Sequence, residues 1–358
     1  MKEPFVTSRM AAWLDLIRAV AALAVLLGHG VQVMGYTGYF PFTIALQQNA
    51  VIVFFVLSGL LIAHSAARAP SLRSYAIARV SRILPVSVGA VAISLAVGLV
   101  DAGLNAPTLF AADAQAGDPA SGFAALLFLG EGYWQTFELN PPYWSLCYEV
   151  WFYALFGAAV FLKGRTQALW LAVLCLAAGA NVLLLLPCWL FGVALHRWGG
   201  ELPLRWARSA LALAFASLFA VQHLAGPLLG VLMKLAPWDL GYSLYALSDL
   251  ILAACIAVGL MGMRTLTAQG VVIPSRVQPV IRYFAEMSFS LYLLHWPVLK
   301  LLRLAGVSVG GNPFALGAVL ALVIAVSAGF AALTEHKRPA VRAWLEQRFS
   351  RRDLLAAD

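Results

Sequence analysis

Long apolar stretches, separated by short polar segments, run along almost the whole chain. Residues 19–27 and 314–333, for example, contain no charged side chain. About 20 apolar residues let a helix cross the hydrocarbon core of a bilayer, and a helix satisfies its own backbone hydrogen bonds in lipid. The pattern therefore predicts an all-α, polytopic membrane protein with about ten transmembrane helices. We expect these spans near residues 11–34, 46–64, 84–103, 144–163, 168–181, 184–197, 209–224, 245–263, 284–303 and 314–334.

Two parts of the chain fit this pattern less simply. The stretch 121–130 is apolar but too short to span a bilayer, so we expect it to dip into the membrane or lie at its interface. The predicted spans 168–181 and 184–197 are also short, and we place a tight turn at Asn181 between them.

Composition excludes a soluble globular protein. The chain of 358 residues is 62% hydrophobic and only 11% charged, whereas a soluble domain carries about 25% charged residues. The net charge of +8 is explained by positively charged cytoplasmic loops, so it does not imply a nucleic-acid partner. The four cysteines fall in apolar stretches without metal-ligand spacing, and we expect no metal site.

The distribution of positive charge predicts the topology. If the N-terminus is cytoplasmic, only Lys234, Lys300 and Arg303 of the 24 Lys and Arg residues face outward, and Arg18 lies within the first span. The remaining 20 lie on the cytoplasmic side, and the outer loop 104–143 has no Lys or Arg. This asymmetry predicts that both termini are cytoplasmic. We expect one membrane domain over residues 1–340 and a short basic cytoplasmic tail at 341–358.

Ionisable residues inside a span are costly and mark functional sites. Arg18 and His29 are eleven residues apart in the first span, close to three helical turns, so both lie on one helix face about 16 Å apart. Asp15, one turn before Arg18, can pair with it. The alternatives are that Arg18 extends toward the interface and that His29 is a hydrogen-bonded core histidine.

Further candidates lie in later spans. Glu149 follows Trp144 and Ser145 and needs a basic partner such as His29, although an acid in a first helical turn also favours the helix dipole. His295, beside Tyr292, is either catalytic or a packing residue. Arg79 and Arg82 lie three residues apart before Pro85, a spacing that suits phosphate binding but also ordinary positive-inside charge.

The same residues lie in five segments that, in order, resemble the motifs of the acyltransferase family 3 membrane proteins. The resemblance covers nearly the full chain and rests on Leu14–Arg18 with His29, on Phe54–Gly59, on Arg79–Pro85, on Trp144–Glu149 with Phe152 and Tyr153, and on Ser290–Pro297.

The resemblance implies an enzyme of the bacterial inner membrane that transfers an acyl group, commonly acetyl, from cytoplasmic acyl-CoA to a hydroxyl of a carbohydrate or glycolipid acceptor. His29 would be the general base, oriented by Glu149. Arg18, Arg79 and Arg82 would hold acyl-CoA. Substrate-binding roles are expected for Trp144, Ser145, Tyr292 and His295.

Two alternatives stay open. Ser58 could act as a covalent relay, although a Ser-Gly pair in a span more often serves helix packing. A proton-coupled transporter could instead use Arg18, His29 and Glu149 as a polar path.

Overall fold

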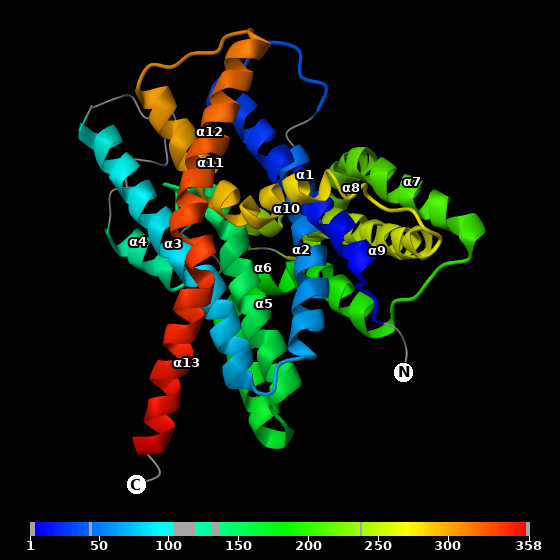
Figure 1. Ribbon diagram of the computed structural model, residues 1–358. Coiled ribbons are helices and arrows are strands. Elements are labelled where there is room, and N and C mark those ends of the chain that lie inside the picture. Colours follow the sequence, from blue (N-terminus) through cyan, green and yellow to red (C-terminus); the bar gives the residue numbers. More distant parts are fainter. Residues whose placement is uncertain (1–3, 43–44, 104–118, 130–135, 237, 356–358) are drawn as a thin grey trace. The chain divides into compact units, whose positions relative to one another are not determined.

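The computed structural model describes residues 4–42, 45–103, 119–129, 136–236 and 238–355, and these ranges contain helices and no strand. Figure 1 shows the helices, which are α1 (Ser8–Val33), α2 (Ala45–Ala66), α3 (Leu72–Gly103), α4 (Pro119–Leu126), α5 (Trp144–Phe161), α6 (Gly164–Trp198), α7 (Leu204–Ala220), α8 (Gln222–Leu235), α9 (Ala246–Ala268), α10 (Gln278–Glu286), α11 (Ser288–Leu304), α12 (Pro313–Leu333) and α13 (Arg338–Leu355). Three short 3-10 turns, η2 (Pro141–Tyr143), η3 (Gly241–Ser243) and η4 (Glu335–Lys337), join them.

The prediction of a polytopic helical membrane protein is confirmed, but the count of ten spans is not. Within the described ranges, seven helices are long and apolar enough to cross a membrane, or up to eight if a bent pair counts as one span. That pair is α7 and α8, bent by 66°, where we had expected a single span at 209–224.

The difference in count has two further causes. The spans expected at 168–181 and 184–197 fall in α6, which consists of two helical segments joined by a kink at Gly179 (φ 81°, ψ 165°), two residues before the turn expected at Asn181. The whole of α6 counts as one candidate span. The span expected at 284–303 corresponds to α11, whose 17 residues extend only about 25 Å, less than a typical hydrocarbon core.

The apolar stretch at 121–130 overlaps α4, an eight-residue helix too short to cross a bilayer, as predicted. Residues 104–118 and 130–135 of the predicted outer loop lie outside the described residues. Lys300, which we expect on the outer side, is a buried residue of α11.

Two compact units interleave along the sequence. The first comprises Met1–Gly28, Tyr39–Arg68 and Cys175–Ser288, and the second comprises His29–Gly38, Ala69–Leu174 and Phe289–Asp358. Helices α1 and α6 therefore each contribute residues to both units.

Small residues allow helices of the first unit to pack closely. α9 packs against α7, α2 and α8. A Cβ atom added at Gly262 of α9 would lie 2.5 Å from the Ala207 carbonyl oxygen of α7, and one added at Gly59 of α2 would overlap the Trp189 carbonyl oxygen of α6. Such contacts let backbones approach where lipid offers no hydrophobic driving force.

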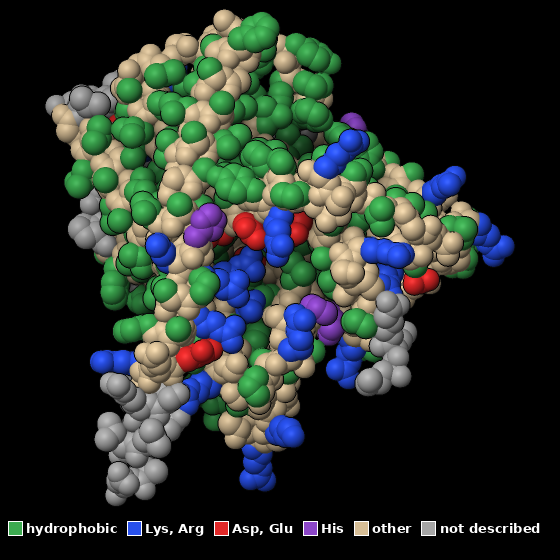
Figure 2. All heavy atoms as spheres, viewed as in Figure 1, with side chains coloured by type: hydrophobic (Ala, Val, Ile, Leu, Met, Phe, Trp, Pro, Cys, Tyr) green, Lys and Arg blue, Asp and Glu red, His purple; other side chains and the backbone are tan. Residues whose placement is uncertain are grey.

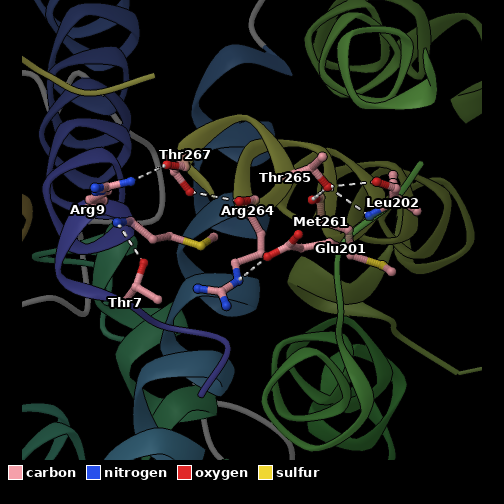
Figure 3. A network of polar contacts seen from close by, with 9 residues as sticks. Thr7, Arg9, Glu201, Leu202, Met261, Arg264, Thr265 and Thr267 are labelled. Carbon is pink, nitrogen blue, oxygen red and sulfur yellow. Dashed lines mark hydrogen bonds and ion pairs between the residues drawn. The ribbon is translucent and has the colours of Figure 1, made fainter. Parts of the chain in front are cut away.

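A polar network joins the start of α1 to the end of α9 within the first unit (Figure 3). Arg9 donates to the Thr267 carbonyl, and Thr267 donates to the Arg264 carbonyl. The buried Arg264 guanidinium lies 3.7 Å from Glu201, which compensates its charge. Arg264 therefore has a structural partner in addition to any effect on topology.

In the second unit, α3 packs against α4, α5 and α13. Figure 2 shows hydrophobic side chains over α12 and Lys and Arg side chains near the start of α13. The exposed apolar residues of α12 include Phe314, Leu322, Val326 and Leu333. These positions suit contact with lipid, whereas α13 has a strongly polar sequence.

Candidate active site

Two histidines of the second unit form the centre of the candidate site. Nδ1 of His29 on α1 lies 2.8 Å from Nε2 of His295 on α11. The two rings are stacked, with centroids 5.0 Å apart and planes 16° apart, and Trp296 approaches the His29 ring edge-on. His295 is fully buried, while His29 is half-buried. His29 is therefore the more accessible member of the pair.

The hydrogen bonds define which nitrogen of each neutral ring carries hydrogen. Nδ1 of His295 lies 3.2 Å from the Leu291 carbonyl oxygen, which can only accept a hydrogen bond, so this nitrogen is the donor. Nε2 of His295 must then accept from Nδ1 of His29. The lone pair of His29 consequently lies on its Nε2 atom, where a general base needs it.

Tyr292 and Ser145, both predicted to bind substrate, meet beside this pair. Their hydroxyl oxygens are 2.7 Å apart, and Tyr292 also donates to the Pro142 carbonyl at 2.9 Å. The Tyr292 ring centroid lies 5.8 Å from that of His295. Both hydroxyl groups are buried and hydrogen-bonded within the protein, so they tie the start of α5 to α11 beside the histidine pair.

Trp144, also predicted to bind substrate, is buried within the second unit. Its side chain is 5% exposed and packs edge-on against Tyr148 with centroids 5.0 Å apart. Tyr143 is fully buried and stacks on Phe128. Tyr143, the last residue of η2, and Trp144, the first residue of α5, both pack inside the second unit.

Glu149 belongs to a second polar group. Tyr153, one turn later on α5, donates to its carboxylate, and Arg79 of α3 lies within electrostatic range. The Arg79 guanidinium also stands 5.8 Å from the centroid of the Tyr75 ring. Among the described residues, the hydrogen-bond partner of His29 is thus His295, where the sequence analysis had expected Glu149.

Arg79 and Arg82 lie on α3, which begins at Leu72 and so includes both residues in one helical turn. Arg338, at the start of α13, interacts electrostatically with both. Sequence reasoning missed Arg338 because it lies about 260 residues from the pair and resembles any positive charge of the tail.

Arg18 lies in the first unit, on the part of α1 that precedes Gly28. Its guanidinium donates to the Ser288 hydroxyl at 3.2 Å, and Asp15 lies within electrostatic range, as the spacing predicted. Helix α1 is continuous through both Arg18 and His29, in agreement with the predicted helical stripe.

Ser58 has a packing role. The Trp189 indole donates to its hydroxyl at 3.2 Å, and the neighbouring Gly59 contacts the backbone of α6. This arrangement supports the helix-packing interpretation of the Ser-Gly pair rather than the covalent relay.

Comparison with known proteins agrees with the geometry. The sequence model of the family described as an acyltransferase domain, acyltransferase 3, matches residues 11–333. No curated protein and no solved structure matched the chain. The match includes Arg18, Arg79, Glu149, His29 and His295 and covers most of the chain, so the protein belongs to acyltransferase family 3 and is a multi-pass membrane acyltransferase.

Proposed function

We propose that this acyltransferase moves an acyl group, with acetyl as the simplest case, from cytoplasmic acyl-CoA to a hydroxyl of a sugar-containing acceptor in the inner membrane of a bacterium. The observation that carries the proposal is the histidine pair. A half-buried imidazole has its Nδ1–H held by a second, buried imidazole, which leaves Nε2 oriented as a base.

In this mechanism the acceptor hydroxyl approaches Nε2 of His29. As its oxygen attacks the thioester carbonyl, Nε2 takes the hydroxyl proton, and the new C–O bond forms. Collapse of the tetrahedral intermediate breaks the C–S bond, and the imidazolium returns the proton to the leaving CoA sulfur. A positioned general base of this kind contributes about 10²–10⁴-fold in rate.

His295 is a positioning residue in this scheme. It accepts the hydrogen bond from His29 Nδ1 and so fixes the ring orientation and stabilises the imidazolium that forms. Glu149 instead supports the arginines of α3, through its proximity to Arg79. Arg18 is proposed to hold the donor from the cytoplasmic end of α1.

Purified protein incubated with radiolabelled acetyl-CoA and membrane glycolipids tests the proposal. Wild-type protein should form a labelled product that mass spectrometry identifies as an ester. His29→Gln should lower the rate by about 10²–10⁴-fold, while His223→Gln, at an exposed histidine of α8, should remain active. A folded His29→Gln protein with near-normal turnover would exclude His29 as the base.

A further inference from the structure

Arg338 shares its surroundings with the two arginines of the α3 motif. Within the second unit, α13 packs against α3, and Arg338 interacts electrostatically with both Arg79 and Arg82. All three side chains are half-buried, and Lys and Arg side chains gather near the start of α13 (Figure 2). Bringing like charges together away from bulk water is unfavourable unless an anion compensates them.

Two of the three guanidinium groups have unused hydrogen-bonding capacity. Neither Arg82 nor Arg338 forms a hydrogen bond or an ion pair with another of the described residues. Each guanidinium has five N–H donors in a planar fork that matches the oxygens of a phosphate. Half-buried donors of this strength indicate a ligand that supplies acceptors.

The nearby acids do not neutralise the cluster. Glu335 interacts electrostatically with Arg338, and its carboxylate accepts a 2.7 Å hydrogen bond from the Ser290 backbone. Glu149 lies near Arg79 and accepts from Tyr153. Three guanidinium groups against two carboxylates leave excess positive charge in this cluster.

We propose that Arg82 and Arg338 together bind the diphosphate bridge of the CoA donor, and that α13 is therefore part of the donor site. The assignment rests on the proposed function for the identity of the donor. The two guanidinium groups, one from α3 and one from α13, match the two adjoining phosphates of the bridge. Each phosphate can accept a bidentate pair of hydrogen bonds from one guanidinium group.

The test measures CoA binding rather than acyl transfer, using the purified full-length protein in uncharged detergent and titration calorimetry. Arg338→Gln should weaken CoA binding by about 10–100-fold, as expected for losing hydrogen bonds to a charged group. Binding of dephospho-CoA, which keeps the diphosphate, should be weakened by the same factor in this variant. Binding of pantetheine 4′-phosphate, which has one phosphate, should be weakened less. Arg338→Lys keeps the charge without the fork and should be intermediate.

Arg342→Gln is the matched control. Arg342 lies one turn later on α13 but is exposed and paired with Glu346 at 2.8 Å, so its loss changes the net charge equally and should leave CoA affinity within about twofold. Thermal unfolding and size-exclusion profiles show whether each variant is folded.

Equal CoA affinity in folded Arg338→Gln and Arg342→Gln would overturn the diphosphate site while leaving the proposed acyl transfer intact. If Arg338→Gln kept its CoA affinity but no longer bound nanodiscs of phosphatidylglycerol, the arginines would bind lipid headgroups. That result would also overturn the diphosphate site. If wild-type protein binds CoA through Arg338 but transfers no acyl group, the proposed function fails and the anion site stands.

Discussion

The side-chain amide of Asn140 donates a 2.9 Å hydrogen bond to the backbone carbonyl of Leu293 in the middle of α11. In a regular helix this carbonyl would accept from the backbone nitrogen four residues later, but that residue is Pro297, which has no N–H. Asn140 is fully buried and so replaces the missing donor. This contact fixes α11 at the level of His295.

Replacing Asn140 by alanine should therefore destabilise the second unit. The Leu293 carbonyl would be left buried without a donor, which costs about 1–3 kcal/mol. The expected result is a lower midpoint of thermal unfolding in detergent. Gln167→Ala is the control, because Gln167 also donates from its side-chain amide to a backbone carbonyl, that of Ala159, but in an exposed position. Equal midpoints for the two variants would contradict this role of Asn140.

The positioning role of His295 predicts a particular pattern of kinetics. His295→Ala should lower kcat by about tenfold or more without raising the donor KM, because His29 loses the acceptor that orients it. His295→Gln keeps an acceptor near the position of Nε2 and should restore part of the rate.

The two histidines should also be non-additive. If His295 acts only through His29, adding His295→Ala to His29→Gln should cause little further loss of rate. Independent, multiplicative losses in the double variant would show that His295 has a separate role, such as direct contact with substrate.

The sequence alone predicts that Arg18 and His29 lie on one helix face, because both belong to one helix and their spacing determines the face that each occupies. It could not predict that His295 pairs with His29, since the two residues are 266 positions apart and their meeting depends on how α11 packs. Because Pro297 has no backbone N–H, the sequence shows that the Leu293 carbonyl needs another hydrogen-bond donor. Nothing in the local pattern identifies Asn140 as that donor.

The helix boundaries show the same limit. Asn181, where we placed a tight turn, is buried. Its amide nitrogen donates to the Asp239 carbonyl and its amide oxygen accepts from the Trp238 indole, both at 2.9 Å. Tertiary partners therefore let a polar residue remain inside α6. The interruption falls at Gly179, whose positive φ is accessible to glycine.

The forked geometry of the α3 arginines gives a further prediction. Replacing both Arg79 and Arg82 by lysine keeps the charge that sets topology but removes bidentate hydrogen bonding. Acyl-CoA affinity should fall by about tenfold or more, while membrane insertion is unchanged. Binding equal to that of the wild-type protein would show that these arginines serve only the topology.

The charge asymmetry of the loops predicts that both termini are cytoplasmic. Reporter fusions should test this in cells: a C-terminal green fluorescent protein should fluoresce, and a C-terminal alkaline phosphatase should be inactive. Fusions after residue 115 of the predicted outer loop should give the opposite result. Phosphatase activity at the C-terminus would reverse the assignment.

The last prediction concerns a buried ion pair of the second unit. Nζ of Lys300 on α11 lies 3.2 Å from the Asp101 carboxylate at the end of α3, and the two side chains are 4% and 8% exposed. Removing one member leaves the other charge buried without compensation, which costs about 3–5 kcal/mol. Lys300→Met should therefore lower the midpoint of thermal unfolding sharply. Asp101→Asn should lower it less, because the Asn amide oxygen can still accept a hydrogen bond from the buried Lys300 ammonium.

The double variant Lys300→Met/Asp101→Leu should recover much of the loss, since an apolar pair of similar volume needs no charge compensation. The comparison pair is Arg342 and Glu346, which are closer, at 2.8 Å, but nearly half exposed. Arg342→Met should cost only about 0–1 kcal/mol because water screens that pair. If Lys300→Met lowered the midpoint of unfolding as little as Arg342→Met, burial would not be the reason that the Lys300–Asp101 pair stabilises the protein.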